Sequence, residues 1–123
     1  MGTILIAERD AIIRCCLCEA IGERGHLVSE ADTPLSAARI AAGYAGRIHA
    51  LVTDDHMPYF DGCMLAQTIR KMYPDLQVLI FSAYHDRRAQ FSVCPHDFVL
   101  RPSDPEIVAS VLDRVIGSGN SSN

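Results

Sequence analysis

Four short apolar runs rich in branched side chains constrain the fold of this chain more than any other feature. They cover residues 4–7, 48–52, 78–81 and 98–100, and each is too short to form a helix. Because their polarity does not alternate, they are typical of strands buried on both faces of a parallel sheet. Residues 26–31 alternate more in polarity, which predicts a further strand nearer the edge of the same sheet.

Apolar side chains with helical spacing occupy the segments between these runs. They recur at positions 13, 16, 17, 20 and 21, and again at 107, 108, 111, 112, 115 and 116. The same spacing predicts buried positions in a middle helix, at Met64, Leu65, Ile69 and Met72. Start signals agree with this division, since Pro34 opens one helix and a capping box from Ser103 to Glu106 opens the last.

The alternation of strands and helices predicts an α/β fold. Right-handed crossovers place helices on both faces of a parallel sheet, so we expect a flavodoxin-like, doubly wound (βα)5 sandwich whose five strands have the order 2-1-3-4-5. The chain has 123 residues, of which 49% are hydrophobic, enough for one core. We expect one domain over residues 1–117 and a flexible tail over residues 118–123.

Charge and hydropathy exclude several classes of protein. The net charge is −4 and the 11 basic residues are scattered, which argues against direct nucleic-acid binding. Neither a bilayer-spanning segment nor a secretion signal is found, so we expect a cytoplasmic protein without a membrane partner. The cysteine count of 5 is odd, which predicts reduced thiols. Cys15 and Cys18 share the predicted outer side of the first helix while Cys16 faces the core, and two thiols alone rarely hold zinc.

Polar side chains follow four of the predicted strands and should meet at one edge of the sheet. In the expected strand order, the switch point lies between the first and third strands, where Glu8 and Asp54 follow. Ser82 follows the fourth strand and Arg101 the fifth. Loops are commonly polar, but the convergence of four strand ends favours a functional site over that simpler interpretation.

The residues after the third strand resemble a known motif. Residues 54–58 read Asp-Asp-His-Met-Pro and are followed by Asp61 and Gly62, which is similar to the phosphoacceptor segment of response regulator receiver domains, the CheY-like modules of two-component signalling. The resemblance covers almost the whole chain. It includes Ser82 followed by a small residue, and Arg101-Pro102 where the family has Lys-Pro.

The resemblance implies a role for each of these positions. Asp54 would be the phosphoacceptor, and Glu8, Asp54 and the backbone carbonyl of His56 would hold Mg²⁺. Arg101 and Ser82 would stabilise the phosphoryl oxygens, and the bond before Pro102 would be cis. Ser82 and Phe98 would be the switch residues that respond to phosphorylation. We interpret the side chain of His56 as a solvent-facing loop residue rather than a ligand.

Arg9 departs from the family pattern because it stands where the second carboxylate of the acidic pair is expected. A guanidinium cannot bind a metal, so Mg²⁺ binding is expected to be weakened or absent. Two outcomes follow: Arg9 pairs with Asp54 as a surrogate cation, or it turns to solvent and leaves a weaker metal site. In a third, Asp10 turns inward instead, which helix geometry disfavours.

Two functions are consistent with these residues. The first is a receiver that accepts a phosphoryl group on Asp54 from a histidine kinase or phosphotransfer protein. It would signal to a downstream protein through the face formed by the fourth helix, fifth strand and fifth helix. The alternative is a phosphorylation-independent pseudo-receiver that acts as an interaction adaptor, favoured by Arg9 and by a short segment between Ser82 and Arg101. In neither case do we expect an enzyme, although receivers assist their own phosphoryl transfer.

Overall fold

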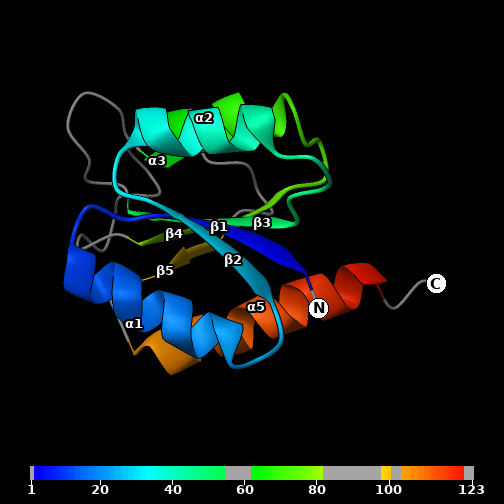
Figure 1. The fold of residues 1–123 in the computed structure, drawn as a ribbon. Helices are drawn as coiled ribbons and strands as arrows, with labels where there is room; N and C mark the ends of the chain where they lie inside the picture. Colours follow the sequence, from blue (N-terminus) through cyan, green and yellow to red (C-terminus); the bar gives the residue numbers. More distant parts are fainter. Residues whose placement is uncertain (1, 55–61, 82–97, 101–103, 121–123) are drawn as a thin grey trace.

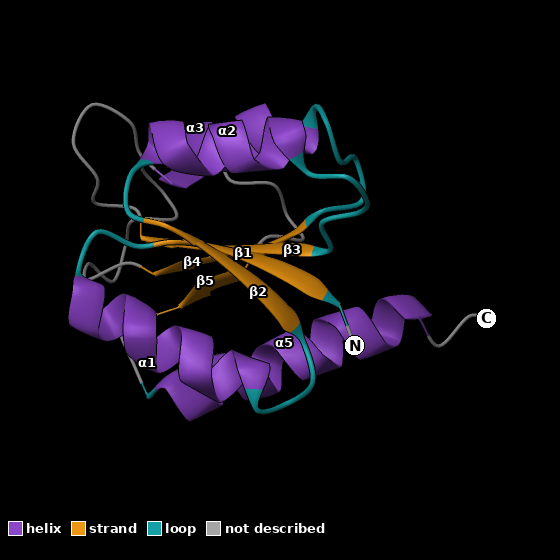
Figure 2. Ribbon diagram, in the orientation of Figure 1, coloured by secondary structure: helices purple, strands orange, loops and turns teal. Residues whose placement is uncertain are grey.

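The computed structural model describes residues 2–54, 62–81, 98–100 and 104–120, which form a parallel sheet between two layers of helices (Figures 1 and 2). In chain order, the elements are β1 (Thr3–Ala7), α1 (Ala11–Gly22), β2 (Leu27–Ala31), α2 (Pro34–Gly43), β3 (Ala50–Asp54), α3 (Gly62–Arg70), β4 (Gln77–Phe81), β5 (Phe98–Leu100) and α5 (Pro105–Asn120). Helices α2 and α3 cover one face of the sheet, and α1 and α5 cover the other.

The sheet has the order β2-β1-β3-β4-β5, and every pair of neighbouring strands is parallel. The first strand therefore lies between the second and third, with Ala7 opposite Ala31 on one side and Thr53 on the other. The predicted doubly wound arrangement of a parallel sheet with helices on both faces is confirmed. Four helices rather than five are present in the described segments, and the expected fourth helix falls within residues 82–97, outside them.

Burial on both faces explains the apolar strand runs. In β1, Leu5 and Ala7 point into the core under α2 and α3, whereas Ile4 and Ile6 point into the core under α1 and α5. All four side chains are fully buried. Because successive side chains of a strand point to opposite faces, a strand covered on both sides must be apolar throughout. The strand buries all of its side chains and leaves only its carboxyl end for chemistry.

Side-chain caps set the helix starts. Asp10 Oδ1 accepts the backbone N–H groups of Ile12 and Ile13, and Thr33 Oγ1 accepts that of Ser36. At α5 the cap is Asp104, whose Oδ1 accepts the N–H of Glu106 at 2.9 Å. The predicted cap, Ser103, lies outside the described residues.

Several predicted side-chain environments were wrong. Met64 and Met72 are 48% and 39% exposed, although they were expected in the core with Leu65 and Ile69. Met72 lies beyond the end of α3 at Arg70, so the helical spacing no longer applies to it. Cys16 is exposed rather than core-facing, whereas Cys18 packs against the core under α1. An apolar side chain at helical spacing is buried only when the helix turns that stripe toward the sheet.

Two element boundaries also differ from the prediction. The third strand begins at Ala50 and ends with Asp54, so Asp54 is its last residue and does not follow it. Helix α5 continues to Asn120, past the expected start of the tail at residue 118, while residues 121–123 lie outside the described part. Glycine and serine lower helix stability by about 1 kcal/mol or less per residue, which the last turn of an established helix tolerates.

Within the described residues, no helix has both the length and the apolar character needed to cross a bilayer.

Two histidines bind the amino end of β1. His26 Nδ1 accepts the backbone N–H of Gly2, and His49 Nδ1 accepts that of Thr3, both at 2.9 Å. Since its Nδ1 is the acceptor, His26 carries its proton on Nε2 and donates it to Asp113 of α5 at 2.7 Å. These bonds anchor the amino end of the central strand to β2, β3 and α5.

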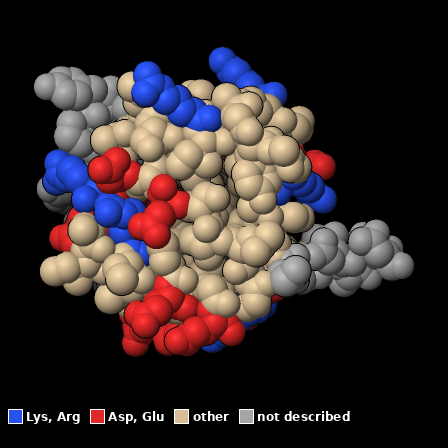
Figure 3. Space-filling view, viewed as in Figure 1, with Lys and Arg blue, Asp and Glu red and all other residues tan. Residues whose placement is uncertain are grey.

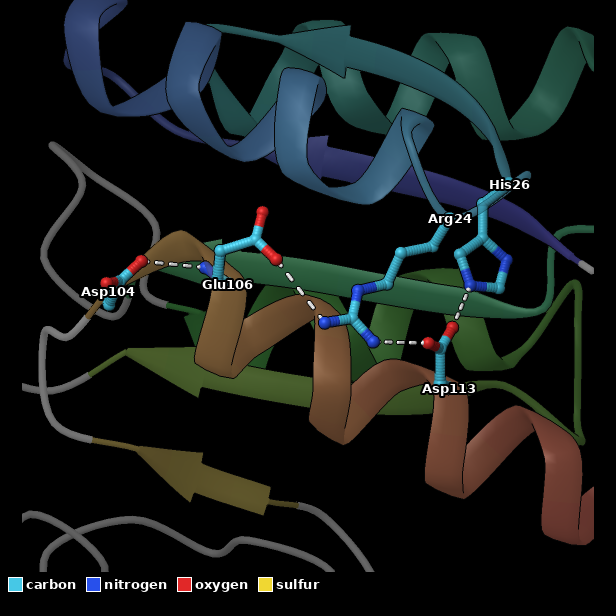
Figure 4. A network of polar contacts seen from close by, with 5 residues as sticks. All are labelled: Arg24, His26, Asp104, Glu106 and Asp113. Atoms are coloured by element: carbon cyan, nitrogen blue, oxygen red, sulfur yellow. Dashed lines mark hydrogen bonds and ion pairs between the residues drawn. The ribbon is translucent and has the colours of Figure 1, made fainter.

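Arg24 extends this network along α5 (Figure 4). Its guanidinium donates to Asp113 Oδ2 at 2.7 Å and to Glu106 Oε2 at 3.3 Å. The two carboxylates belong to turns of α5 that are separated along the helix, so one arginine from the turn after α1 joins both. Helices α1 and α5 are thus tied at the surface as well as through their shared core.

Candidate functional site

The carboxylates of Glu8 and Asp54 lie at the carboxyl edge of the two central strands. Glu8 directly follows β1, and Asp54 is the last residue of β3, which pairs with β1 in parallel register. Ala7 is opposite Thr53, so the next residue of each strand brings the two acids together. Glu8 is 5% exposed, and Asp54 is partly exposed and makes a further interaction. The edge therefore combines a buried acid with an accessible one.

Hydrogen bonds hold Glu8 in this position. Its backbone N–H donates to Ala31 O at 3.0 Å, which extends the β1–β2 ladder by one residue. Its Oε2 accepts the backbone N–H of Asp10 at 3.0 Å. The side chain of Glu8 thus folds back over the turn that follows β1. Hydrogen bonds therefore fix both the main chain and the carboxylate of Glu8.

The environment of Glu8 makes ionisation of its carboxyl group less favourable than it is in water. Burial raises the pKa of Glu8 above its ordinary value, and the negative charge of Asp54 raises it further, while the backbone N–H of Asp10 acts in the opposite direction. Two acids that share one edge of a sheet disfavour ionisation of each other. A cation bound between them would relieve both the burial cost and this repulsion.

Arg9 lies outside this acidic pair. Its side chain is exposed, and among the residues that the structure describes no ion pair joins it to Asp54. This exposure is what the solvent-facing orientation of Arg9 requires, and the weaker metal site expected with it remains a prediction. Asp10 is also exposed, and its carboxylate caps α1, so it does not replace the missing acid.

Arg14 is the feature of this site that sequence reasoning missed. From α1, its NH1 group donates to the backbone carbonyl of Glu8 at 2.8 Å, and its Nε donates to Glu30 Oε1 at 3.1 Å. Its side chain is 19% exposed. The sequence does contain a signal for this contact, which is the spacing between Arg14 and the acidic turn. Arg14 lies one helical turn after Asp10, on a helix that starts directly beside that turn.

The oxygen atoms at this edge are the type of ligand that a magnesium site requires. Mg²⁺ prefers hard oxygen ligands, and Glu8 and Asp54 supply two carboxylates at the same edge of the sheet. Within the described segments, no cluster of three or more His, Cys, Asp or Glu side chains is placed to hold a metal. A complete shell would therefore need water or backbone oxygens besides these two acids. The carbonyl expected from the sequence, that of His56, lies outside the described residues.

The remaining predicted residues are only partly covered by the structure. Phe98 is the first residue of β5, opposite Leu79 of β4, and its backbone is described. Ser82 and Arg101 directly follow β4 and β5 along the chain but lie outside the described residues, as does the Arg101-Pro102 peptide bond. Their predicted roles remain predictions.

The surface around the site is mixed in charge (Figure 3). Basic and acidic side chains are interspersed at the left of the view, where α1 begins, and the middle of this face is largely uncharged. At the start of α1, Ile12 is 76% exposed and Ile13 is 47% exposed. An apolar surface therefore adjoins the acidic turn.

Similar proteins agree with this architecture. A family model described as "Response regulator receiver domain" matches residues 4–113. A solved receiver domain from the hybrid histidine kinase CckA is 27% identical, with a TM-score of 0.78, covering 92% of this chain and 97% of that one. A receiver domain protein from Clostridium thermocellum, 20% identical with a TM-score of 0.85, covers all of both chains and shares the fold.

Curated relatives are longer proteins. The sensor kinase CckA of Brucella abortus is 29% identical over 108 residues, which are 81% of this chain and 11% of the relative. The transcriptional regulator NtrC of Rhizobium meliloti, described as DNA-binding, is 30% identical over 118 residues, 94% of this chain and 24% of the relative. The chain thus spans between about a tenth and a quarter of these relatives. On the family match, the sheet topology and the acidic edge, the chain belongs to the response regulator receiver domain family, the signalling modules of two-component systems.

Proposed function

We propose that this receiver domain accepts a phosphoryl group on Asp54 and thereby switches a protein-interaction face. The observation that carries the proposal is the pairing of buried Glu8 with accessible Asp54 at the carboxyl edge of the central strands, while Arg9 points to solvent. Arg9 is exposed, and Asp54 is partly exposed at the end of β3, which supports a role for Asp54 as the acceptor. This favours a phosphorylation-dependent receiver over the pseudo-receiver alternative.

In the proposed reaction, an Asp54 carboxylate oxygen attacks the phosphorus of a phosphohistidine. A P–O bond forms, the P–N bond breaks, and the imidazole leaving group takes up a proton. Mg²⁺, when bound, supplies positive charge to the phosphoryl oxygens. Glu8 would be the second acid that holds it, and Arg101 and Ser82 are proposed to contact the transferred oxygens.

Acetyl phosphate with Mg²⁺ tests the proposal directly. Intact-mass measurement is expected to show one added phosphoryl group on the parent chain, removable by hydroxylamine, as an acyl phosphate should be. Asp54→Asn should lack the adduct, whereas the matched variant Asp55→Asn should retain it. A parent chain that gains no adduct, or an adduct that survives in Asp54→Asn, would contradict the proposal.

The phosphodonor is proposed to be a histidine kinase or phosphotransfer protein that docks over the start of α1. Any protein donor must cover the rim of the acidic edge, and the exposed side chains of Ile12 and Ile13 begin four residues after Glu8. Exposed large apolar side chains next to a functional site are typical of protein contacts. For the downstream partner, we propose the face formed by the segment after β4, β5 and α5.

Donor docking can be separated from chemistry with one pair of variants. Ile12→Ser should slow transfer from a kinase that phosphorylates the parent chain, yet leave labelling by acetyl phosphate unchanged. Leu35→Ser is the control, because Leu35 is 61% exposed but lies on α2, on the other face of the sheet. Equal transfer rates for Ile12→Ser and the parent would contradict docking at this surface.

A further inference from the structure

Arg14 joins three elements that meet beside the acidic edge. It belongs to α1, its NH1 group binds the carbonyl oxygen of Glu8 in the turn after β1, and its Nε binds the carboxylate of Glu30 on β2. The two bonds are 2.8 and 3.1 Å long, and they use different nitrogens of one planar guanidinium. The orientation of the Glu8 carbonyl is therefore fixed by a side chain that is itself anchored.

The turn that Arg14 holds is the one that presents the Glu8 carboxylate. The Glu8 N–H is fixed by Ala31 O, the Glu8 carbonyl by Arg14, and the Glu8 carboxylate by the N–H of Asp10. Loss of the Arg14 bond would free the peptide group between Glu8 and Arg9 to rotate. The N–H of Asp10 follows directly, so its bond to the carboxylate would weaken as well.

Glu30, on the edge strand β2, anchors the guanidinium of Arg14. It lies opposite Ile6 in the β1–β2 pairing, two positions before the level of Glu8, and its side chain is 54% exposed. It does not reach the acidic pair and acts on it through Arg14. Glu30 also raises the pKa of the Cys18 thiol, so it influences two side chains of α1.

We propose that Arg14, anchored by Glu30, is a positioning residue of the acidic pocket, and that it strengthens divalent-cation binding even though it is itself a cation. The inference rests on the proposed function, in which Glu8 is a metal ligand. Groups that orient metal ligands typically change metal affinity by about 10- to 100-fold when they are mutated.

The sign of the effect distinguishes positioning from simple electrostatics. If Arg14 acted only through its charge, its removal would lower the positive potential near the site and tighten Mg²⁺ binding. If it were only a structural link between α1 and β2, its removal would lower stability and leave affinity unchanged. Of the three roles, only positioning predicts that removal of Arg14 weakens Mg²⁺ binding.

The experiment measures the Mg²⁺ dissociation constant by NMR titration of amide resonances in the full 123-residue chain, at constant ionic strength. Arg14→Met is expected to raise the dissociation constant about tenfold. Arg24→Met is the matched control, since Arg24 also links two elements through its guanidinium but binds α5. It should remain within about twofold of the parent, because its charge is distant and screened. Urea unfolding of both variants reports their stability separately.

Two further variants make the result specific. Glu30→Met should weaken Mg²⁺ binding, and combining it with Arg14→Met should add nothing, because two residues that act through one contact are not additive. Glu8→Gln tests the proposed metal ligand separately from the positioning role of Arg14. If Glu8→Gln weakens binding but Arg14→Met leaves it equal or tighter, the positioning role is wrong and the proposed function stands. If the parent shows no Mg²⁺-dependent change, the positioning role is overturned, whereas the proposed function is decided separately by the acetyl phosphate test.

Discussion

Glu8 and Asp54 end two neighbouring parallel strands, and the charge of Asp54 contributes to a raised pKa of Glu8. The two acids are thus electrostatically coupled through one edge of the sheet. A coupled, partly buried pair of acids attracts a cation more strongly than either acid alone, because ligand binding removes their repulsion. The proposed metal site would draw on this coupled pair, although Arg9 replaces the expected second acid of the turn.

Restoring the missing acid should strengthen Mg²⁺ binding. Arg9→Asp replaces a positive charge by a negative one beside Glu8, and we expect affinity to rise by about tenfold, equivalent to about 1.4 kcal/mol. Arg9→Gln removes only the positive charge and should give an intermediate value. Isothermal titration calorimetry with Mg²⁺ checks the order of the three chains. Equal affinities would mean that the exposed guanidinium does not influence the site.

The stability of the fold should fall in mild acid because of His49. Burial lowers the pKa of His49 below the ordinary value of 6.5, so the neutral ring that accepts the Thr3 N–H is the favoured folded form. Below about pH 6.5, the unfolded chain gains a proton that the folded chain resists. The contribution is therefore complete above pH 6.5 and is lost as pH falls through the lowered pKa.

Urea unfolding at several pH values between 7.5 and 5 checks this prediction. His49→Asn should unfold more easily at pH 7.5, by about 1 kcal/mol for a weakened hydrogen bond, and should show a smaller pH slope than the parent. An identical slope in parent and variant would assign the acid sensitivity to other groups.

Removal of Asp113 should cost more stability than removal of Arg24, although the two form one ion pair. Asp113→Ala leaves the Nε2–H of His26, a side chain only 2% exposed, without its partner, which costs about 1–3 kcal/mol. Arg24→Ala leaves only partly exposed carboxylates, which water can solvate, so its effect should be smaller. Thermal or urea unfolding of the two variants decides the order, and the reverse order would show that His26 does not depend on Asp113.

Cys18 should react more slowly with alkylating agents than Cys15 and Cys16. Burial, together with the charge of Glu30, raises the pKa of the Cys18 thiol to about 12, whereas Cys15 and Cys16 are exposed. At pH 8 only on the order of one Cys18 thiol in ten thousand would be ionised. Iodoacetamide labelling followed by peptide mass mapping measures the three rates, and Glu30→Gln should accelerate Cys18 selectively. Comparable rates at all three positions would contradict the prediction.

The central strands and the acidic pair could be predicted from the sequence because each depends on a local pattern. An apolar run such as residues 4–7 has few alternatives to a buried parallel strand, and parallel order then brings the ends of β1 and β3 together. The start of α2 was predictable for the same reason, since Thr33 and Pro34 act within one turn.

Other features depend on contacts between elements and could not be predicted from the sequence. Cys16 and Met64 have the spacing of buried residues, but each lies on a side of its helix that is turned to solvent. The role of Arg14 depends on Glu30, sixteen positions later, being brought beside it by the β1–β2 pairing. The side on which Arg9 would lie could not be decided either, because both orientations satisfied the same electrostatics.

The position of β2 at the edge of the sheet has a consequence for self-association. An edge strand can add a strand from another molecule, and natural proteins discourage this with charged side chains. Leu27 is 59% exposed on β2, whereas Glu30 places a carboxylate near the other end of the same five-residue strand. The carboxylate that anchors Arg14 thus also places a charge on the edge strand, of the kind that natural proteins use to discourage pairing with a second molecule.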